Sequence, residues 1–127
     1  MTKINDIYYC PICKNVVEVT HEGADALVCC GESMKLLVAN SVDASAEKHV
    51  PVIVTTHGGV IVHVGSAEHP MTPEHYIVFI ELFTGDQVWR ANLQPGMKPE
   101  AFFPIEEGKI IYVREYCNLH GLWRTES

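Results

Sequence analysis

Long apolar runs are missing from this sequence of 127 residues, and basic side chains are few. No apolar run approaches the roughly 20 residues that a membrane-spanning helix needs. Nine Lys and Arg stand against 16 Asp and Glu, which gives a formal net charge of −7. Binding to nucleic acid or to an anionic membrane requires clustered basic residues, so neither partner is expected. The first residues also lack the basic start and the apolar core of a secretory signal, and we expect a cytoplasmic protein.

Helical periodicity is scarce as well, whereas short β-branched runs separated by turn residues are frequent. The dipeptides Gly58-Gly59 and Gly85-Asp86 predict two hairpin turns. The strands predicted around and after these turns cover residues 50–56, 60–65, 76–84, 87–93 and 109–116. Short strands at this spacing predict an antiparallel β-sandwich of immunoglobulin-like architecture, so the expected fold class is all-β.

Four of the five cysteines lie within residues 1–37. A segment this short cannot bury enough apolar surface to fold unaided, and such segments usually need a metal ion or disulfides. The segment 38–47 is small and polar and is interpreted as a linker. We therefore predict a small metal-stabilised N-terminal β module over residues 1–37, followed by the β-sandwich domain over residues 38–127.

The cysteine pattern predicts a metal site in this module. An odd number of cysteines cannot all pair as disulfides, and a Cys-x-x-Cys turn places two thiolates on one side of a tight loop. Two adjacent cysteines on the second arm should bend the local backbone if both bind one ion. A disulfide pair and a structural zinc are the alternatives, and the spacing does not separate zinc from iron, because both accept four thiolates. The four predicted ligands are Cys10, Cys13, Cys29 and Cys30.

A second set of metal-ligating residue types lies at strand ends and in loops of the predicted sandwich. Pro51 and Pro70 stand near two of the histidines and should stiffen their loops. Taken singly, each histidine is explained as a surface residue, and the cysteine as a small buried hydrophobe. Five such residues at the loop edges of one domain favour a metal site instead. The predicted ligands are His49, His69, His75, Cys117 and His120, whereas His21, His57 and His63 have no such company and are left out.

The stretches EKHVP, EHPM…HY and REYCNLHG, behind CPIC…CC, resemble desulfoferrodoxin, the two-iron form of superoxide reductase, over essentially the whole chain. The resemblance implies two iron ions per chain, with zinc or calcium as alternative occupants. One iron would be held by the four cysteines. The other would be five-coordinate, with four imidazoles in a plane, the Cys117 thiolate axial and the sixth position open. The resemblance also implies a reduced rubredoxin-like electron donor and a homodimer.

Such a ligand set suits the reduction of superoxide to hydrogen peroxide. An open position admits a small diatomic molecule, and the thiolate opposite it pushes electron density onto the iron. Within the resemblance, Glu47 and Lys48 match the pair of residues beside the open position. Lys48 would supply a local positive charge to an anionic substrate, and Glu47 would bind the ferric ion after the product leaves. The alternatives are an iron electron-transfer protein without its own substrate and a zinc-stabilised binding module.

Overall fold

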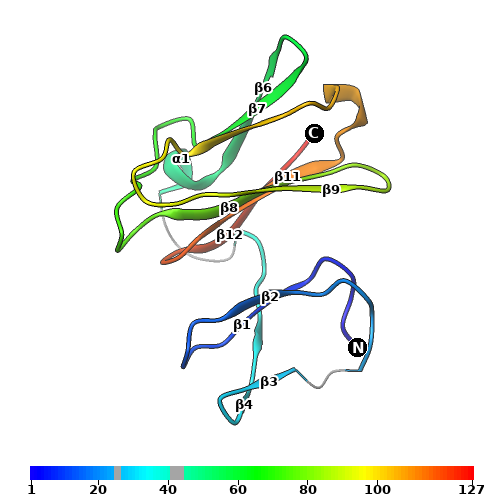
Figure 1. Cartoon of the computed structure of the whole chain (residues 1–127), viewed down its shortest axis with the longest axis vertical. Helices are drawn as coiled ribbons and strands as arrows, with labels where there is room; N and C mark the ends of the chain where they lie inside the picture. Colours follow the sequence, from blue (N-terminus) through cyan, green and yellow to red (C-terminus); the bar gives the residue numbers. More distant parts are fainter. Residues whose placement is uncertain (25–26, 41–44) are drawn as a thin grey trace. The chain divides into compact units, whose positions relative to one another are not determined.

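The computed structural model describes residues 1–24, 27–40 and 45–127. The chain divides into two compact units, Met1–Val38 and Ala39–Ser127 (Figure 1). Within the predicted linker 38–47, residues 41–44 lie outside the described residues. The last two residues of that segment belong to α1 (Ala46–His49), a single helical turn that the sequence pattern did not predict.

The first unit consists of short strands around very little core. One sheet has the order β2-β1-β5, and β3 and β4 form a separate hairpin. Its described strands are β1 (Ile7–Tyr9), β2 (Val16–Glu18), β3 (Val28–Cys29), β4 (Glu32–Ser33) and β5 (Lys35–Leu36). Among its described residues the buried apolar side chains are Ile7 and Cys10. At about 1.5–3 kcal/mol for each buried side chain, they cannot offset the entropy of ordering the chain, so this unit needs another source of stability.

The second unit is an antiparallel β-sandwich. One sheet, of order β10-β7-β6, comprises β6 (Pro51–Thr56), β7 (Gly59–Val64) and β10 (Glu100–Phe103). The other, of order β12-β11-β8-β9, comprises β8 (Ile77–Phe83), β9 (Val88–Asn92), β11 (Tyr112–Cys117) and β12 (Gly121–Glu126). The prediction of an all-β chain with a small N-terminal module and a sandwich is confirmed. In the described part of the chain, helices are too short or too polar to cross a membrane.

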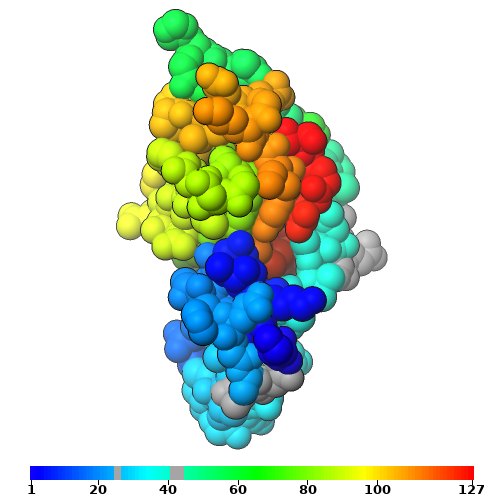
Figure 2. Space-filling model, turned by 90° about the vertical axis from the view of Figure 1, so that its right-hand side faces the viewer, coloured from blue at the N-terminus to red at the C-terminus, as the bar shows by residue number. Residues whose placement is uncertain are grey.

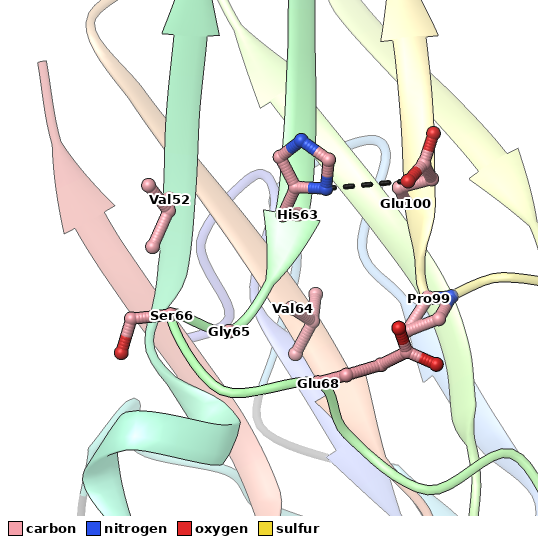
Figure 3. A pocket seen from close by; sticks show the side chains of 8 residues that line it. All are labelled: Val52, His63, Val64, Gly65, Ser66, Glu68, Pro99 and Glu100. Carbon is pink, nitrogen blue, oxygen red and sulfur yellow. Dashed lines mark ion pairs between the residues drawn. The ribbon is translucent and has the colours of Figure 1, made fainter.

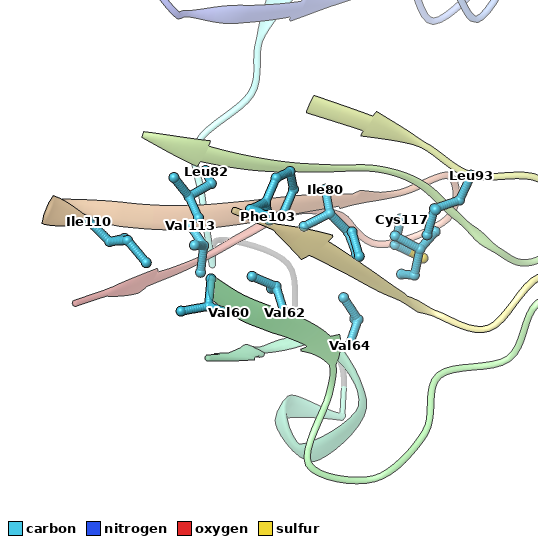
Figure 4. Packing of buried hydrophobic residues seen from close by; sticks show 12 residues of the cluster. Val60, Val62, Val64, Ile80, Leu82, Leu93, Phe103, Ile110, Val113 and Cys117 are labelled. Carbon is cyan, nitrogen blue, oxygen red and sulfur yellow. The ribbon is translucent and has the colours of Figure 1, made fainter. Parts of the chain in front are cut away.

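The sandwich core lies between the inner faces of these two sheets (Figure 4). Alternation along β7 turns Val60, Val62 and Val64 inward, and all three are buried. They belong to one cluster with Leu82 of β8 and Cys117 of β11. The cysteine therefore approaches its site from inside the hydrophobic core.

The turn between β6 and β7 projects from the rest of the sandwich (Figures 1 and 2). Thr56 pairs with Gly59, so His57 and Gly58 form the turn, one residue earlier than predicted. Gly58, the second residue of the turn, takes a positive φ of 81°, which glycine adopts without strain. Gly59 has a different role, because a Cβ atom there would collide with the Phe103 carbonyl oxygen of β10.

Two strands of the sandwich were not predicted, and one predicted strand begins late. β10 and β12 had no assignment from the sequence, although each pairs along its length with a neighbouring strand. The predicted strand 109–116 starts only at Tyr112, because Glu107–Lys109 form the 3₁₀ turn η1. The paired strands β8 and β9 agree with the prediction to within one residue at each end.

Candidate metal centres

The first arm of the four-cysteine site is the turn that follows β1. The Cys10 N–H donates to the Asn15 carbonyl at 2.9 Å, and the Lys14 N–H donates to the Cys10 carbonyl at 2.9 Å. The turn closed by these bonds places the Cys13 N–H 3.5 Å from the Cys10 sulfur. Both thiols therefore lie on the same side of a tight loop, as the Cys-x-x-Cys spacing predicts.

The second arm is the two-residue turn of the β3–β4 hairpin. Cys29 pairs with Glu32, which leaves Cys30 and Gly31 as the turn residues. Both take positive φ angles, 54° at Cys30 and 76° at Gly31, the pattern of a type I′ turn. A non-glycine residue in this region is uncommon. The predicted backbone bend at the adjacent cysteines is confirmed.

The ligand atoms of these four cysteines all lie within 4.8 Å of one another. Each of the five cysteines in the chain, all of them described, is a free thiol. The Cys13 N–H lowers the pKa of Cys10 to about 6, whereas the neighbouring Cys13 and Cys10 sulfurs raise the pKa of Cys29 to about 12. Sulfurs 3.4 Å apart, as in Cys13 and Cys29, resist joint ionisation. A bound cation removes this conflict, so the four thiols fit a thiolate-binding metal ion.

The second cluster is assembled from separate loops at one end of the sandwich. Its residues are His49 at the end of α1, His69 and His75 between β7 and β8, Cys117 at the end of β11, and His120 before β12. The exposed fraction is 2% for His49, 1% for His69 and 0% for Cys117. The other two histidines are half-buried. The structure thus brings all five predicted ligands together, and His21, His57 and His63 do not join either group.

The four imidazole rings form a square. Successive ring centroids around it lie 4.7 Å (His49–His69), 4.7 Å (His69–His75), 5.1 Å (His75–His120) and 4.8 Å (His120–His49) apart. The diagonal from His49 to His75 is 6.3 Å, longer than every side, as expected for four rings around a common centre. Neighbouring rings stand nearly perpendicular, at 73–89°. This arrangement is that of four ligands around one centre.

Hydrogen bonds at the far side of two rings fix which nitrogens face that centre. The Nδ1 atoms of His49 and His69 each lie 2.6 Å from a backbone carbonyl, of Ser45 and Pro70, and must donate to it. Each Nε2 therefore carries a lone pair, and these two atoms face each other at 3.2 Å. Two lone pairs at this distance repel unless a cation lies between them.

The spacing of the nitrogens also fits a first-row metal ion. Such ions bind imidazole nitrogen at about 2.0–2.1 Å, so adjacent nitrogens in a square plane lie about √2 times farther apart, near 3 Å. The His49 Nε2 is 3.2 Å from the His69 Nε2 and 3.0 Å from the His120 Nδ1. Among the described residues, the buried Nε2 of His75 has no hydrogen-bond partner. A metal ion at the centre of the square would serve all four nitrogens.

Burial favours the neutral form of the histidine ligands, which is the form of imidazole that binds a metal. It lowers the pKa of His49 and His75, and it lowers the pKa of His69 to about 4, so these rings are neutral at pH 7. Burial raises the pKa of the Cys117 thiol, and the backbone N–H groups of Leu119 and His120 partly offset this by donating toward the sulfur. Metal binding would release the thiol proton.

The pairing of β11 with β8 is irregular beside the cysteine, while alternation along β11 places Cys117 on the same inward face as Val113. Along β11 and β8 the pairing runs regularly to Tyr116 and Phe79, and then shifts so that Cys117 faces Ile77. The extra residue, Val78, belongs to β8, and such bulges are frequent beside functional sites. Glu115, two residues earlier, is fully buried, and burial raises the pKa of its carboxyl well above the ordinary value.

The chain matches the family model for desulfoferrodoxin over residues 41–126 and that for the desulfoferrodoxin N-terminal domain over residues 2–37. The chain belongs to the desulfoferrodoxin family. It is 55% identical to the desulfoferrodoxin of Syntrophotalea carbinolica over 96% of both chains. A desulfoferrodoxin homolog of Methanothermobacter thermautotrophicus is 50% identical, over 97% of this chain and 99% of the homolog.

Among solved structures, the chain is similar to the superoxide reductase from Treponema pallidum. The TM-score is 0.74 and the sequence identity is 31%, over 94% of this chain and 98% of that one. The four-cysteine cluster and the cluster of four histidines and one cysteine match the two iron centres of desulfoferrodoxins. The prediction of two iron centres per chain is confirmed by this match of both ligand clusters to the family.

Asn118 is a functional residue that the sequence pattern did not single out. Its side-chain carbonyl accepts from the Tyr76 N–H at 2.9 Å, and its side-chain N–H donates to the Glu74 carbonyl at 3.0 Å. The side-chain amide thus binds the backbone on both sides of His75. It ties the loop of that ligand to the turn that carries Cys117 and His120.

Trp123 was also missed, because a tryptophan usually signals core packing. Its ring centroid lies 5.1 Å from that of His49, and its indole N–H donates to the His120 carbonyl at 3.0 Å. One buried side chain therefore contacts two adjacent corners of the histidine square.

Glu47 and Lys48 occupy the exposed surface of α1, immediately before His49. A hydrogen bond from the Ser45 side chain holds the pKa of the Glu47 carboxyl below its ordinary value, so this group is ionised at pH 7. His63 was not predicted as a ligand. It lies on the outer face of the sheet β10-β7-β6, where its Nδ1 is 3.3 Å from the Glu100 carboxylate (Figure 3).

Proposed function

We propose that this chain is a superoxide reductase that converts superoxide to hydrogen peroxide at the histidine site. The observation that carries this proposal is the square of four imidazoles with one thiolate contributed from the core. Five donors leave one position of an octahedral ion free, whereas a pure electron carrier keeps its metal saturated. The similarity to a solved superoxide reductase over nearly the whole chain supports the same conclusion.

Burial of the thiol indicates where substrate would enter. Cys117 is fully buried in the core, so its side of the square is closed, whereas His75 and His120 are half-buried. A small anion would therefore approach from the side opposite the sulfur. An iron ion held by the four imidazoles and the thiolate would supply one electron. One superoxide and two protons would then give one hydrogen peroxide, and the ferrous ion would become ferric.

Two residues of α1 are proposed to assist the reaction. The Lys48 ammonium, one residue before a ligand, would attract the anion against the net charge of −7 and orient a water molecule that donates a proton. The Glu47 carboxylate would occupy the free position after the peroxide has left. Both side chains are exposed, which leaves them free to reach toward the square.

The decisive experiment mixes the reduced, iron-loaded protein with superoxide in a stopped-flow or pulse-radiolysis instrument. We expect each reduced histidine site to consume one superoxide, to become oxidised and to produce one hydrogen peroxide, with no release of dioxygen. Zinc-loaded protein is the control, because zinc cannot supply an electron. Dioxygen release would indicate a dismutase, and absence of any reaction would indicate an electron-transfer protein without its own substrate.

Three further properties stay proposals that rest on this function. They are a reduced rubredoxin-like electron donor, a homodimeric assembly and a cytoplasmic location. Reoxidation of a reduced rubredoxin by the ferric protein, followed by its visible absorbance, tests the donor. Light scattering of the purified iron-loaded protein tests the assembly, and a monomer at micromolar concentration would contradict it. Fractionation of the source cells tests the location.

A further inference from the structure

The helical turn that carries Glu47 and Lys48 cannot support itself. α1 has four residues, and no side-chain hydrogen bond caps its start at Ser45. Nucleation of a helix is unfavourable, so a single isolated turn is not stable in water. Both functional side chains are exposed and add no packing. The buried His49, bonded to the Ser45 carbonyl, anchors the end of the turn, so the two exposed residues before it depend on a contact from another part of the chain.

The loop after β7 makes that contact through backbone atoms. The Ala67 N–H donates to the Glu47 carbonyl at 2.7 Å, and the Ser66 hydroxyl donates to the same oxygen at 3.2 Å. A Cβ atom at Gly65 would lie 2.7 Å from that carbonyl oxygen and 3.0 Å from the Lys48 carbonyl carbon. Figure 3 shows Gly65 and Ser66 in this loop, beside the helical turn. The two segments are too close for even a methyl group.

The same loop leads directly to a metal ligand. The His69 N–H donates to the Val64 carbonyl at 2.9 Å, and the Gly65 N–H donates to the Ala67 carbonyl at 3.1 Å. These two bonds close the loop between the end of β7 and His69, which is the first metal ligand after that strand. A shift of the loop would therefore move the α1 turn relative to the square.

We propose that Gly65, with the loop 65–67, is a positioning element that fixes the backbone of Glu47 and Lys48 beside the metal site. The inference rests on the proposed function and adds residues that the sequence does not connect with it. The loop touches neither substrate nor metal. It acts by holding the Cα positions from which two flexible charged side chains work.

The test compares Gly65→Ala with Gly85→Ala, a control position where an added methyl group would meet no atom within 4 Å and where φ is not positive. In iron-loaded protein, Gly65→Ala should slow the second-order reaction with superoxide by about 10-fold, as loss of the Lys48 charge would. The double variant Gly65→Ala/Lys48→Ile should be no slower than Lys48→Ile alone, because both changes remove the same contribution. Gly85→Ala should keep the wild-type rate.

A second readout does not depend on activity. In zinc-loaded protein, hydrogen exchange at the Ala67 amide should be faster in Gly65→Ala than in wild type, because its bond to the Glu47 carbonyl is lost. Zinc should still bind at the histidine site. A wild-type rate together with a protected Ala67 amide would overturn the proposal. Independent, multiplicative effects of the two substitutions would overturn it too.

Ser66→Ala decides the matter if Gly65→Ala does not fold or bind metal. It removes one hydrogen bond to the Glu47 carbonyl and should slow the reaction about two- to fivefold, with no further loss in the Lys48→Ile background. An unchanged rate would overturn the proposal. If Lys48→Ile itself leaves the rate unchanged, the proposed role of Lys48 is wrong. In that case Ala67 exchange alone decides whether the loop holds the turn.

Discussion

The two metal centres of this chain are held by different means. The four-cysteine site takes its ligands from two tight turns in a unit with almost no core, and Cys13 and Cys30 are exposed. The histidine site takes its ligands from separate loops of a packed sandwich, and most of them are buried. We therefore expect the metal to stabilise the fold in the first unit, and the fold to arrange the ligands before any metal binds in the second.

Metal removal gives the largest difference between the two units. After treatment with a strong chelator, the unit Met1–Val38 should lose its structure, because its described residues bury little besides Ile7 and Cys10. The sandwich should keep its strands. Amide hydrogen exchange checks both outcomes in one experiment, and metal-free protein with a protected β1 would contradict the contrast. Zinc-reconstituted protein is the control.

Cys117→Ser should be the most damaging substitution at the histidine site. It replaces a soft, electron-donating thiolate by a poor ligand inside the core, where Cys117 has no exposed surface. We expect the superoxide rate to fall by at least about 100-fold, and the visible sulfur-to-iron band of the oxidised site to disappear. His75→Ala, which removes one imidazole, is the comparison and should cost less. Survival of the band would show that Cys117 is not a ligand.

Asn118→Ala tests whether the sandwich really pre-arranges the histidines. The change removes the two hydrogen bonds to the backbone of Glu74 and Tyr76, so the loop that carries His75 is held less firmly. Loss of such supporting contacts typically lowers metal affinity by about 10- to 100-fold, and competition with a chelator of known affinity measures it. Asn92→Ala, at an exposed position of β9, is the matched control. Equal affinities in the two variants would mean that the ligands hold themselves in place.

Lys48→Ile separates the attraction of superoxide by this one lysine from the repulsion by the net negative charge of the chain. At physiological ionic strength the Debye length is about 8 Å, so distant carboxylates are largely screened while a lysine beside the entry point is not. The variant should react about 10-fold more slowly with superoxide. Added salt should slow the wild-type protein and leave the variant unchanged or faster. Identical rates and salt slopes would reduce Lys48 to an ordinary surface charge.

Cys13→Ser should have the smallest effect on the reaction. It removes a ligand from a site whose four thiolates leave no position for substrate, in a compact unit distinct from the sandwich. The protein should lose one iron while its superoxide rate stays within about threefold of wild type, a difference below roughly 1 kcal/mol in barrier. A collapse of that rate with the second iron intact would show that the two centres act together.

The sequence predicted the ligands far better than the residues that hold them. Thiols and imidazoles have metal chemistry of their own, so their positions at loop edges were informative. Asn118 and Gly65 act through an amide and through the absence of a side chain, and such roles depend on which loops the fold brings together. The single turn α1 was missed for the same reason, since its support comes from the loop 65–67.

The strands were predicted where the chain alternates regularly or repeats β-branched residues, as in β7 and β8. β10 is only four residues long and begins with Glu100, so its pattern is too short to separate from a loop. β12 carries two consecutive buried residues, Leu122 and Trp123, which breaks the period of two. In both cases pairing with an adjacent strand decides the structure, and that pairing is not visible in a local window.

Trp123 also makes the histidine site observable without any label. Its indole lies 5.1 Å from the His49 ring, and it is one of two tryptophans in the chain. The other, Trp89, lies in β9 and donates its N–H to Gln87, away from the ligands. The chain thus has a built-in optical reporter beside the metal and an internal reference on another strand. With Trp89→Phe, all remaining tryptophan emission comes from the ring beside the histidine site.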